Sequence, residues 1–170
     1  GGAITRGRYD VIPTGRNIYS LDPDVVPTKA AWMIGIRLAD AVLEKYLNEE
    51  GRYPESFGIY WMCNDIMWAD GEGMAQLLYL IGVRPIWQPN GKVMKFEVIS
   101  LEELGRPRVD IQAHVSGILR DNFSSRMDLL DEAIRFVAQL DEPEEMNYLK
   151  KHTKANLRNG MDLKTAATRI

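Results

Sequence analysis

Cysteine is almost missing from the sequence, because Cys63 is the only one in 170 residues. The chain cannot form a disulfide bond within itself, so a reducing, cytoplasmic setting is expected. No apolar run reaches the roughly 20 residues that a membrane-spanning helix requires. The first residues, from Gly1 to Arg6, also lack the apolar stretch of a signal peptide. The sequence therefore predicts a cytoplasmic protein without a membrane span.

Motifs for nucleotides and metals are missing as well. Neither a G-x-G-x-x-G motif nor a Walker A loop occurs, so we expect no dinucleotide or ATP site on this chain. The net charge of −3 lacks the basic footprint of a nucleic-acid-binding protein. The two histidines, His114 and His152, do not have the spacing of paired ligands on a helix, and one cysteine cannot build a structural zinc site. We expect His152 to be exposed to solvent and no cofactor to be bound by this chain alone.

The composition is that of a globular domain, with 45% hydrophobic and 26% charged residues. We expect an extended N-terminal segment at residues 1–27, which are rich in Gly, Pro and polar side chains. An α/β domain should follow at 28–158. Residues 159–170 are expected to be a tail or the start of a next segment. The polar ends suggest an internal fragment of a longer protein.

Periodicity and capping residues predict the order of the elements. A first helix should begin after Thr28 and run to about Asn48, because apolar residues recur there at helical spacing. A run of β-formers at 57–62 predicts a buried strand. Asn90-Gly91 between two β-like runs predicts a hairpin. Five further elements are expected: a helix from Met74 to Ile81, a helical turn from Ser100 to Glu103, a strand at 109–115, a long helix capped by Ser124 or Ser125, and a last helix at 144–158.

This order of strands and helices is typical of an α/β fold. Right-handed crossovers would keep its main strands parallel. We therefore predict a three-layer, Rossmann-like or flavodoxin-like domain with a mainly parallel sheet and a β-hairpin. Ligands of such sheets bind beyond the carboxyl ends of the strands. The loops at 63–73 and 116–123 should lie side by side at that edge.

These two loops and their borders carry groups that can accept protons or hold a divalent metal. For each group a structural role is open as well. Glu72 could simply favour a helix N-terminus, Arg120 and Asp121 could form a local ion pair, and His114 could be a packed structural histidine. The residues alone leave both interpretations open.

Several strings, in order over most of the chain, resemble one known family. They are Pro13–Tyr19 (PTGRNIY), Gly71–Gln76 (GEGMAQ), Leu101–Asp110 (LEELGRPRVD), Ser116–Phe123 (SGILRDNF) and Glu142–Asn147 (EPEEMN). The family is that of the large, tetrapyrrole-binding subunit of cobaltochelatase and magnesium chelatase. The sequence departs from its pattern at Trp61–Asp65, where many members have Trp-Gly-Thr followed by an acidic residue, and at Leu119, which replaces a usual Phe.

The resemblance implies a fragment of an ATP-dependent ligase that inserts a metal ion into a tetrapyrrole. Family members work with an AAA+ ATPase subunit and a second partner subunit, and they use ATP and Co²⁺ or Mg²⁺. Cobalt insertion in cobalamin synthesis is the first expectation. Magnesium insertion into protoporphyrin for chlorophyll, or a scaffold or interaction role without catalysis, is the alternative. The fragment alone should be inactive.

Site residues can be assigned on these grounds, although no metal ligand can. Glu72 and His114 are the candidate catalytic residues. The candidate substrate-binding residues are Arg16, Asn17, Asn64, Asp65, Gln76, Ser116, Arg120 and Asp121.

Overall fold

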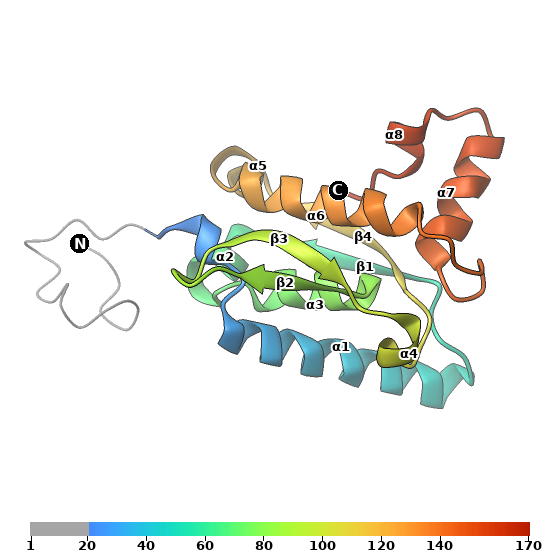
Figure 1. Cartoon of the computed structure of the whole chain (residues 1–170), viewed down its shortest axis with the longest axis horizontal. Helices are drawn as coiled ribbons and strands as arrows, with labels where there is room; N and C mark the ends of the chain where they lie inside the picture. Colours follow the sequence, from blue (N-terminus) through green and yellow to red (C-terminus); the bar gives the residue numbers. More distant parts are fainter. Residues whose placement is uncertain (1–20) are drawn as a thin grey trace, which may run out of the picture.

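The structure, a computed structural model, describes residues 21–170. It is a mixed α/β fold with two separate two-stranded sheets (Figure 1). Strand β1 (Ser56–Trp61) pairs in parallel with β4 (Asp110–Val115). Strand β2 (Val83–Trp87) pairs antiparallel with β3 (Val93–Val98). The α/β class and the hairpin are thus confirmed. The described strands do not form one mainly parallel sheet, and no clear three-layer Rossmann arrangement is present in residues 21–170.

Helices pack against both sheets, and α1 and α6 run along opposite sides of the hairpin in Figure 1. In chain order the helical elements of the described part are η2 (Pro23–Val25, a 3-10 turn), α1 (Lys29–Glu50), α2 (Cys63–Trp68), α3 (Glu72–Ile81), α4 (Leu101–Leu104), α5 (Gly117–Asn122), α6 (Ser124–Ala138), α7 (Tyr148–Arg158) and α8 (Leu163–Ala166).

The predicted ends of α1 are confirmed. The Thr28 hydroxyl accepts a hydrogen bond from the Ala31 N–H at 3.2 Å, which satisfies one of the free donors of the first turn. At the other end Gly51 takes a left-handed conformation with φ of 68° and donates its N–H to the Leu47 carbonyl. Local chemistry therefore sets both ends of this helix.

Helix α3 is the centre of the core and contacts α1, α6, β2 and β4. Most of its side chains are buried, which is why it is predominantly apolar. Gly35 of α1 lies against it, and a Cβ added there would come within 2.5 Å of the Ala75 Cβ. A glycine at this position therefore lets the two helices pack closely.

Two arginines of the string Leu101–Asp110 hold the C-terminal end of α3. The Arg106 guanidinium donates to the Tyr79 carbonyl at 2.7 Å and to the Leu80 carbonyl at 3.2 Å. The Arg108 guanidinium donates to the Gly82 carbonyl at 2.7 Å. Cations at a helix C-terminus satisfy its free carbonyls and oppose the negative end of its dipole. This string therefore has a structural role.

Helices also occupy the two predicted loops, since α2 and α5 form there. The expected cap of α6 by Ser124 or Ser125 is wrong, because α6 has Phe123 as its N-cap and no side-chain cap. Only Phe123 separates α5 from α6, so both serines already lie in the first turn of α6. The last long helix begins at Tyr148, four residues later than expected, and the Asn147 side chain caps it.

The C-terminal residues lie beside β4, where the Ala113 N–H donates to the Arg169 carbonyl at 2.7 Å. Ala166 and Ala167 are buried. Residues 1–20 of the expected N-terminal segment lie outside the described residues, and the division into 1–27, 28–158 and 159–170 stays a prediction. Among the described helices, none is both long and apolar enough to cross a lipid bilayer.

Candidate functional site

The parallel pairing of β1 with β4 places both predicted loops at one edge of the sheet. Trp61 and Val115, the last residues of the two strands, are register partners. Helix α2 follows the first strand and α5 follows the second. The prediction that the two segments start side by side at the carboxyl edge is confirmed.

Asp65 caps the N-terminus of α3 from within α2. Its carboxylate accepts hydrogen bonds from the Gly73 N–H at 2.7 Å, the Met74 N–H at 2.9 Å and the Trp61 indole N–H at 2.9 Å. Burial raises the pKa of Asp65, whereas these three hydrogen bonds lower it. A carboxylate that accepts from three protein donors is well explained as a structural group. Its predicted contact with substrate stays a prediction.

Glu72 and Gln76 lie on the first turns of α3, and both are half-buried. Glu72 is the first residue of this helix, where a negative charge interacts favourably with the helix dipole. No hydrogen bond or ion pair of the Glu72 side chain is found within residues 21–170. The Glu72 carboxylate therefore fits the structural role as well as the catalytic one.

His114 lies on the exposed face of β4, next to Tyr60 of β1. The two residues are register partners, and their ring centroids are 5.4 Å apart with an interplanar angle of 35°. Tyr60 is 78% exposed. The imidazole of His114 is thus accessible and in contact with one aromatic ring, and it is not packed in the core.

The remaining candidates on α2 and α5 are mostly exposed. The Ser116 hydroxyl accepts from the Leu119 N–H at 3.3 Å and so caps α5. Arg120 and Asp121 form an ion pair at 2.9 Å, and their side chains are 67% and 62% exposed. This is the local ion pair that the sequence analysis gave as the structural alternative. Such exposed pairs contribute little to stability. Asn64 is exposed, whereas Arg16 and Asn17 lie outside the described residues.

The structure does not join these candidates into one catalytic centre. No hydrogen bond or ion pair within the described part of the chain connects Glu72, His114 and Arg120. No group of three or more His, Cys, Asp or Glu side chains suited to a metal ion occurs in residues 21–170. What the edge offers is an accessible imidazole, a half-buried carboxylate and an exposed ion pair on neighbouring elements.

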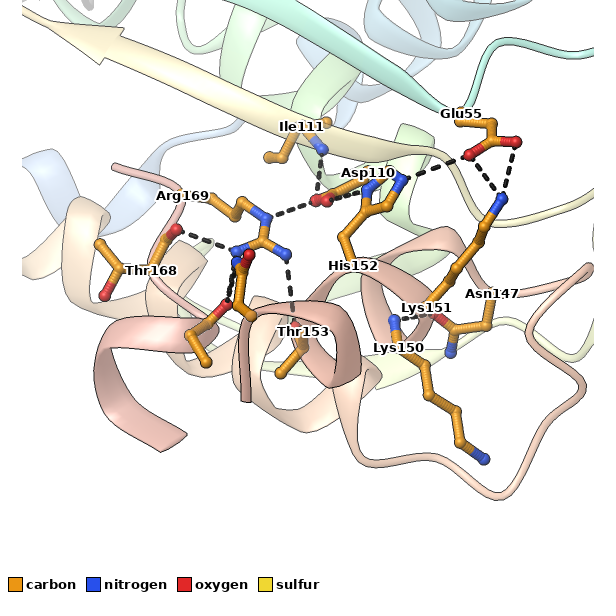
Figure 2. Close-up of polar contacts among 12 residues, drawn as sticks. Glu55, Asp110, Ile111, Asn147, Lys150, Lys151, His152, Thr153, Thr168 and Arg169 are labelled. Carbon is orange, nitrogen blue, oxygen red and sulfur yellow. Dashed lines mark hydrogen bonds and ion pairs between the residues drawn. The ribbon is translucent and has the colours of Figure 1, made fainter. Parts of the chain in front are cut away.

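A larger polar network, which the sequence did not reveal, lies at the opposite end of the sheet (Figure 2). Asp110, at the start of β4, is 4% exposed and accepts from the Arg169 Nε at 2.7 Å. The His152 Nδ1 lies 2.8 Å from the other Asp110 oxygen, and its Nε2 lies 3.3 Å from Glu55. The Lys151 ammonium donates to both Glu55 oxygens at 2.8 and 2.7 Å. His152 lies on helix α7, as expected, but its side chain is only 31% exposed, so the expectation of solvent exposure is wrong.

The chemistry of this network favours structural cross-linking over metal binding. Ionised carboxylates only accept hydrogen bonds, so an imidazole between two of them donates from both nitrogens in its protonated form. The hydrogen bond from Lys151 lowers the pKa of Glu55, and burial opposes this change. Lys151 and Arg169 supply positive charge beside the carboxylates, where a metal ion would otherwise be needed. One signal in the sequence could have indicated this network: a charged residue, Asp110, at the start of a predicted buried strand requires partners.

Three comparisons with known proteins agree with this fold and these motifs. The sequence profile of the family described as CobN/Magnesium Chelatase matches residues 1–170. An uncharacterized protein of Methanocaldococcus jannaschii is 56% identical over 169 residues, which are 99% of this chain and 14% of that protein. The chloroplastic magnesium-chelatase subunit ChlH of Oryza sativa is 46% identical over 162 residues, which are 94% of this chain and 12% of that subunit.

A solved structure, the catalytic subunit of cobaltochelatase from Mycobacterium tuberculosis, superimposes with a TM-score of 0.90 at 42% identity. The match covers 99% of this chain and 14% of that subunit. The chain thus spans 12% to 14% of the length of these relatives. Similar identities to a magnesium and a cobalt subunit leave the metal unresolved. The chain belongs to the CobN/Magnesium Chelatase family.

Proposed function

We propose that this chain is part of the large subunit of an ATP-dependent metal chelatase that inserts cobalt into a tetrapyrrole in cobalamin synthesis. The observation that carries the proposal is the similarity to the catalytic subunit of cobaltochelatase over 99% of the chain, with a TM-score of 0.90. Magnesium insertion into protoporphyrin is the second candidate, because the ChlH subunit of Oryza sativa is 46% identical.

The proposed reaction requires more than this chain. Cobalt, or magnesium in the alternative, is the substrate ion, and ATP is hydrolysed by an AAA+ ATPase subunit with the help of a second partner subunit. The chain itself has no nucleotide-binding motif, and we propose that it binds no cofactor and works in the cytoplasm. The three-layer domain expected from the sequence would form only if other parts of the subunit add strands and helices to β1 and β4.

Within the subunit we infer a scaffold role for this segment. Its polar motif residues mainly satisfy the protein's own backbone: Asp65 and Ser116 cap helices, whereas Arg106 and Arg108 hold the end of α3. Side chains engaged in this way are poorly placed to transfer protons. The catalytic roles predicted for Glu72 and His114 form the competing proposal.

Reconstitution tests the choice of metal. The longer subunit that contains this chain would be mixed with its two partner subunits and ATP, and supplied either with Co²⁺ and a corrin-type ring or with Mg²⁺ and protoporphyrin. Absorbance spectra report the metallated product. We expect an ATP-dependent cobalt product. A magnesium product alone would replace the first candidate by the second. The absence of both products would contradict both candidates.

Substitution separates the scaffold role from the catalytic one. His114→Gln and Glu72→Gln would be compared with Lys95→Gln, a control on the exposed hairpin. General acid–base groups contribute about 100-fold to 10,000-fold to a rate. A scaffold role predicts losses of only a few-fold, similar to the control. A loss of about 100-fold with unchanged thermal stability would assign proton transfer to the residue concerned.

A further inference from the structure

The two faces of the β1–β4 sheet differ in what covers them. Phe57, Ile59 and Trp61 of β1 pack into the hydrophobic core together with Ile111 and Ala113 of β4. The alternate residues point to the other side, because side chains alternate along a strand. On that side Gly58, Tyr60, Gln112 and His114 are exposed. We call these four residues the open face.

The open face carries no Asp, Glu, Lys or Arg. The outer face of the hairpin provides a comparison within the same chain, since Arg84, Lys95 and Glu97 occupy it beside Ile86, and Arg84 pairs with Glu97 at 3.0 Å. That face has the charged composition of a surface in contact with water. The open face instead has an aromatic pair, an amide and a glycine, which is unusual for a solvated sheet.

Parallel strands are normally covered on both faces by helices. Helix α3 contacts β4 on the core side. The other side is covered only where the sheet begins, because Asp110 is buried beneath contacts with His152 of α7 and with Arg169 (Figure 2). The cover ends before Tyr60 and His114. The rest of this side therefore lacks the second layer of helices that usually covers a parallel pair.

We propose that the open face is the docking surface for a helix of the same large subunit that lies outside residues 1–170. This inference rests on the proposed function, which makes the chain part of a longer subunit. The relatives offer ample sequence for such a helix, because the chain spans only 12% to 14% of their length. A neutral, two-stranded face fits a helix better than a tetrapyrrole, because ligand sites are concave.

The chemistry of the face defines the helix that it would take. A Cβ built at Gly58 would have no atom within 4 Å, so the space above this residue is open. Beside it, Tyr60 and His114 form a ridge across the two strands. The complementary helix would place small or apolar side chains over Gly58. It would also bring an acceptor for the Tyr60 hydroxyl, because buried tyrosines usually find a hydrogen-bond partner.

Thiol accessibility in the longer subunit tests the proposal. In a Cys63→Ser background, with any cysteines outside this chain also replaced, Gln112→Cys and the control Lys95→Cys would be treated with a thiol reagent. Rates would be compared between the native and the urea-unfolded subunit. We expect Gln112→Cys to react about 100-fold more slowly when native, as for a site that opens only by local unfolding. The control should react at similar rates in both states.

Other outcomes would overturn the docking helix. Equal reaction at Gln112→Cys in both states would show an open surface. Protection that appears only with the ATPase subunit, or only with tetrapyrrole, would assign the face to that partner or ligand. Chelatase activity of the Cys63→Ser background, measured alongside, tests the proposed function separately, because inactivity with a protected thiol would refute that function and keep the docked face.

A second variant makes the test independent of cysteine. Gly58→Arg should clash with nothing in the described part of this chain, because a Cβ at this position has no atom within 4 Å and the residue is exposed. In the longer subunit the same arginine would be forced under the docked helix, so Gln112→Cys should lose its protection. A subunit that keeps full protection with Arg at position 58 would contradict the proposal.

Discussion

Arg108 should be the most sensitive polar position in the chain. Its side chain is fully buried and donates to Glu142 from Nε and Nη2, both at 2.8 Å. It also donates to the carbonyls of Gly82 and Ile99, each at 2.7 Å. One guanidinium thereby connects the end of α3, the segment after β3 and the turn after α6.

The expected cost of Arg108→Met follows from what it leaves behind. Among the described residues, Glu142 would keep only the Asn147 amide as a side-chain partner, at 2.9 Å, in a largely buried position. Removing one member of a buried ion pair costs about 3–5 kcal/mol, because the other charge stays buried without compensation. For a domain of this size such a loss lowers Tm by roughly 10 °C.

Urea and thermal unfolding of the 170-residue chain, followed by far-UV circular dichroism, would measure the loss. Arg135→Met is the matched control, because Arg135 pairs with Asp131 across one helical turn and both side chains are about one-third exposed. The control should lose no more than about 0.5 kcal/mol. The double variant Arg108→Met with Glu142→Gln should lose less than the sum of the two single changes, since no unpaired carboxylate is left.

The reasoning would be refuted by a small effect. A loss below about 1 kcal/mol for Arg108→Met, or one equal to that of Arg135→Met, would show that the buried pair contributes no more than an exposed one. Additive losses in the double variant would show that Arg108 and Glu142 act independently.

Three further predictions concern packing, capping and pH. Gly35→Ala should lower the free energy of unfolding in urea by about 1–3 kcal/mol, because its Cβ would come within 2.5 Å of the Ala75 Cβ. An unchanged urea midpoint would disprove the close packing of the two helices. Asp65→Ala should lower the free energy of unfolding by about 1–2 kcal/mol, because the cap of α3 is lost. An unchanged stability would show that Asp65 is not needed as a cap. The pKa of Glu55 is lower in the folded chain than its ordinary value of 4.5, so its ionised carboxylate stabilises the fold. This stabilisation should be complete at pH values above 4.5 and should be lost as the pH falls through the lower pKa of the folded state. Lys151→Met should raise the pKa of Glu55 in an NMR titration, and an unmoved titration would contradict the pairing.

Much of the secondary structure was predictable because its causes are local. The cap at Thr28 and the αL glycine at Gly51 bound α1, and the Ser100 hydroxyl caps α4 as its spacing to Glu103 predicts. Asn90-Gly91 placed the hairpin turn. The two short helices α2 and α5 were not predictable, because they have six residues each and show too little periodicity.

The candidate edge was predictable in position, although the roles of its residues were not. Two buried-strand patterns, each followed by a helix with an apolar inner face, predicted that the segments after β1 and β4 lie together, and the parallel pairing of these strands confirms it. Whether a carboxylate such as Asp65 binds a ligand or caps a helix depends on which N–H groups point at it. That information lies in the approach of α2 to α3, which no sequence window contains.

The sequence by itself determined the family, through ordered motifs, and the local elements, through caps, turns and periodicity. The tertiary structure alone decided that the strands form two sheets, that Arg106 and Arg108 serve the end of α3, and that His152 is drawn into a network. His152 meets Asp110 and Glu55 across 42 and 97 residues of chain. Contacts over such separations leave no periodic trace, because they depend on how whole elements pack and not on the residues beside them.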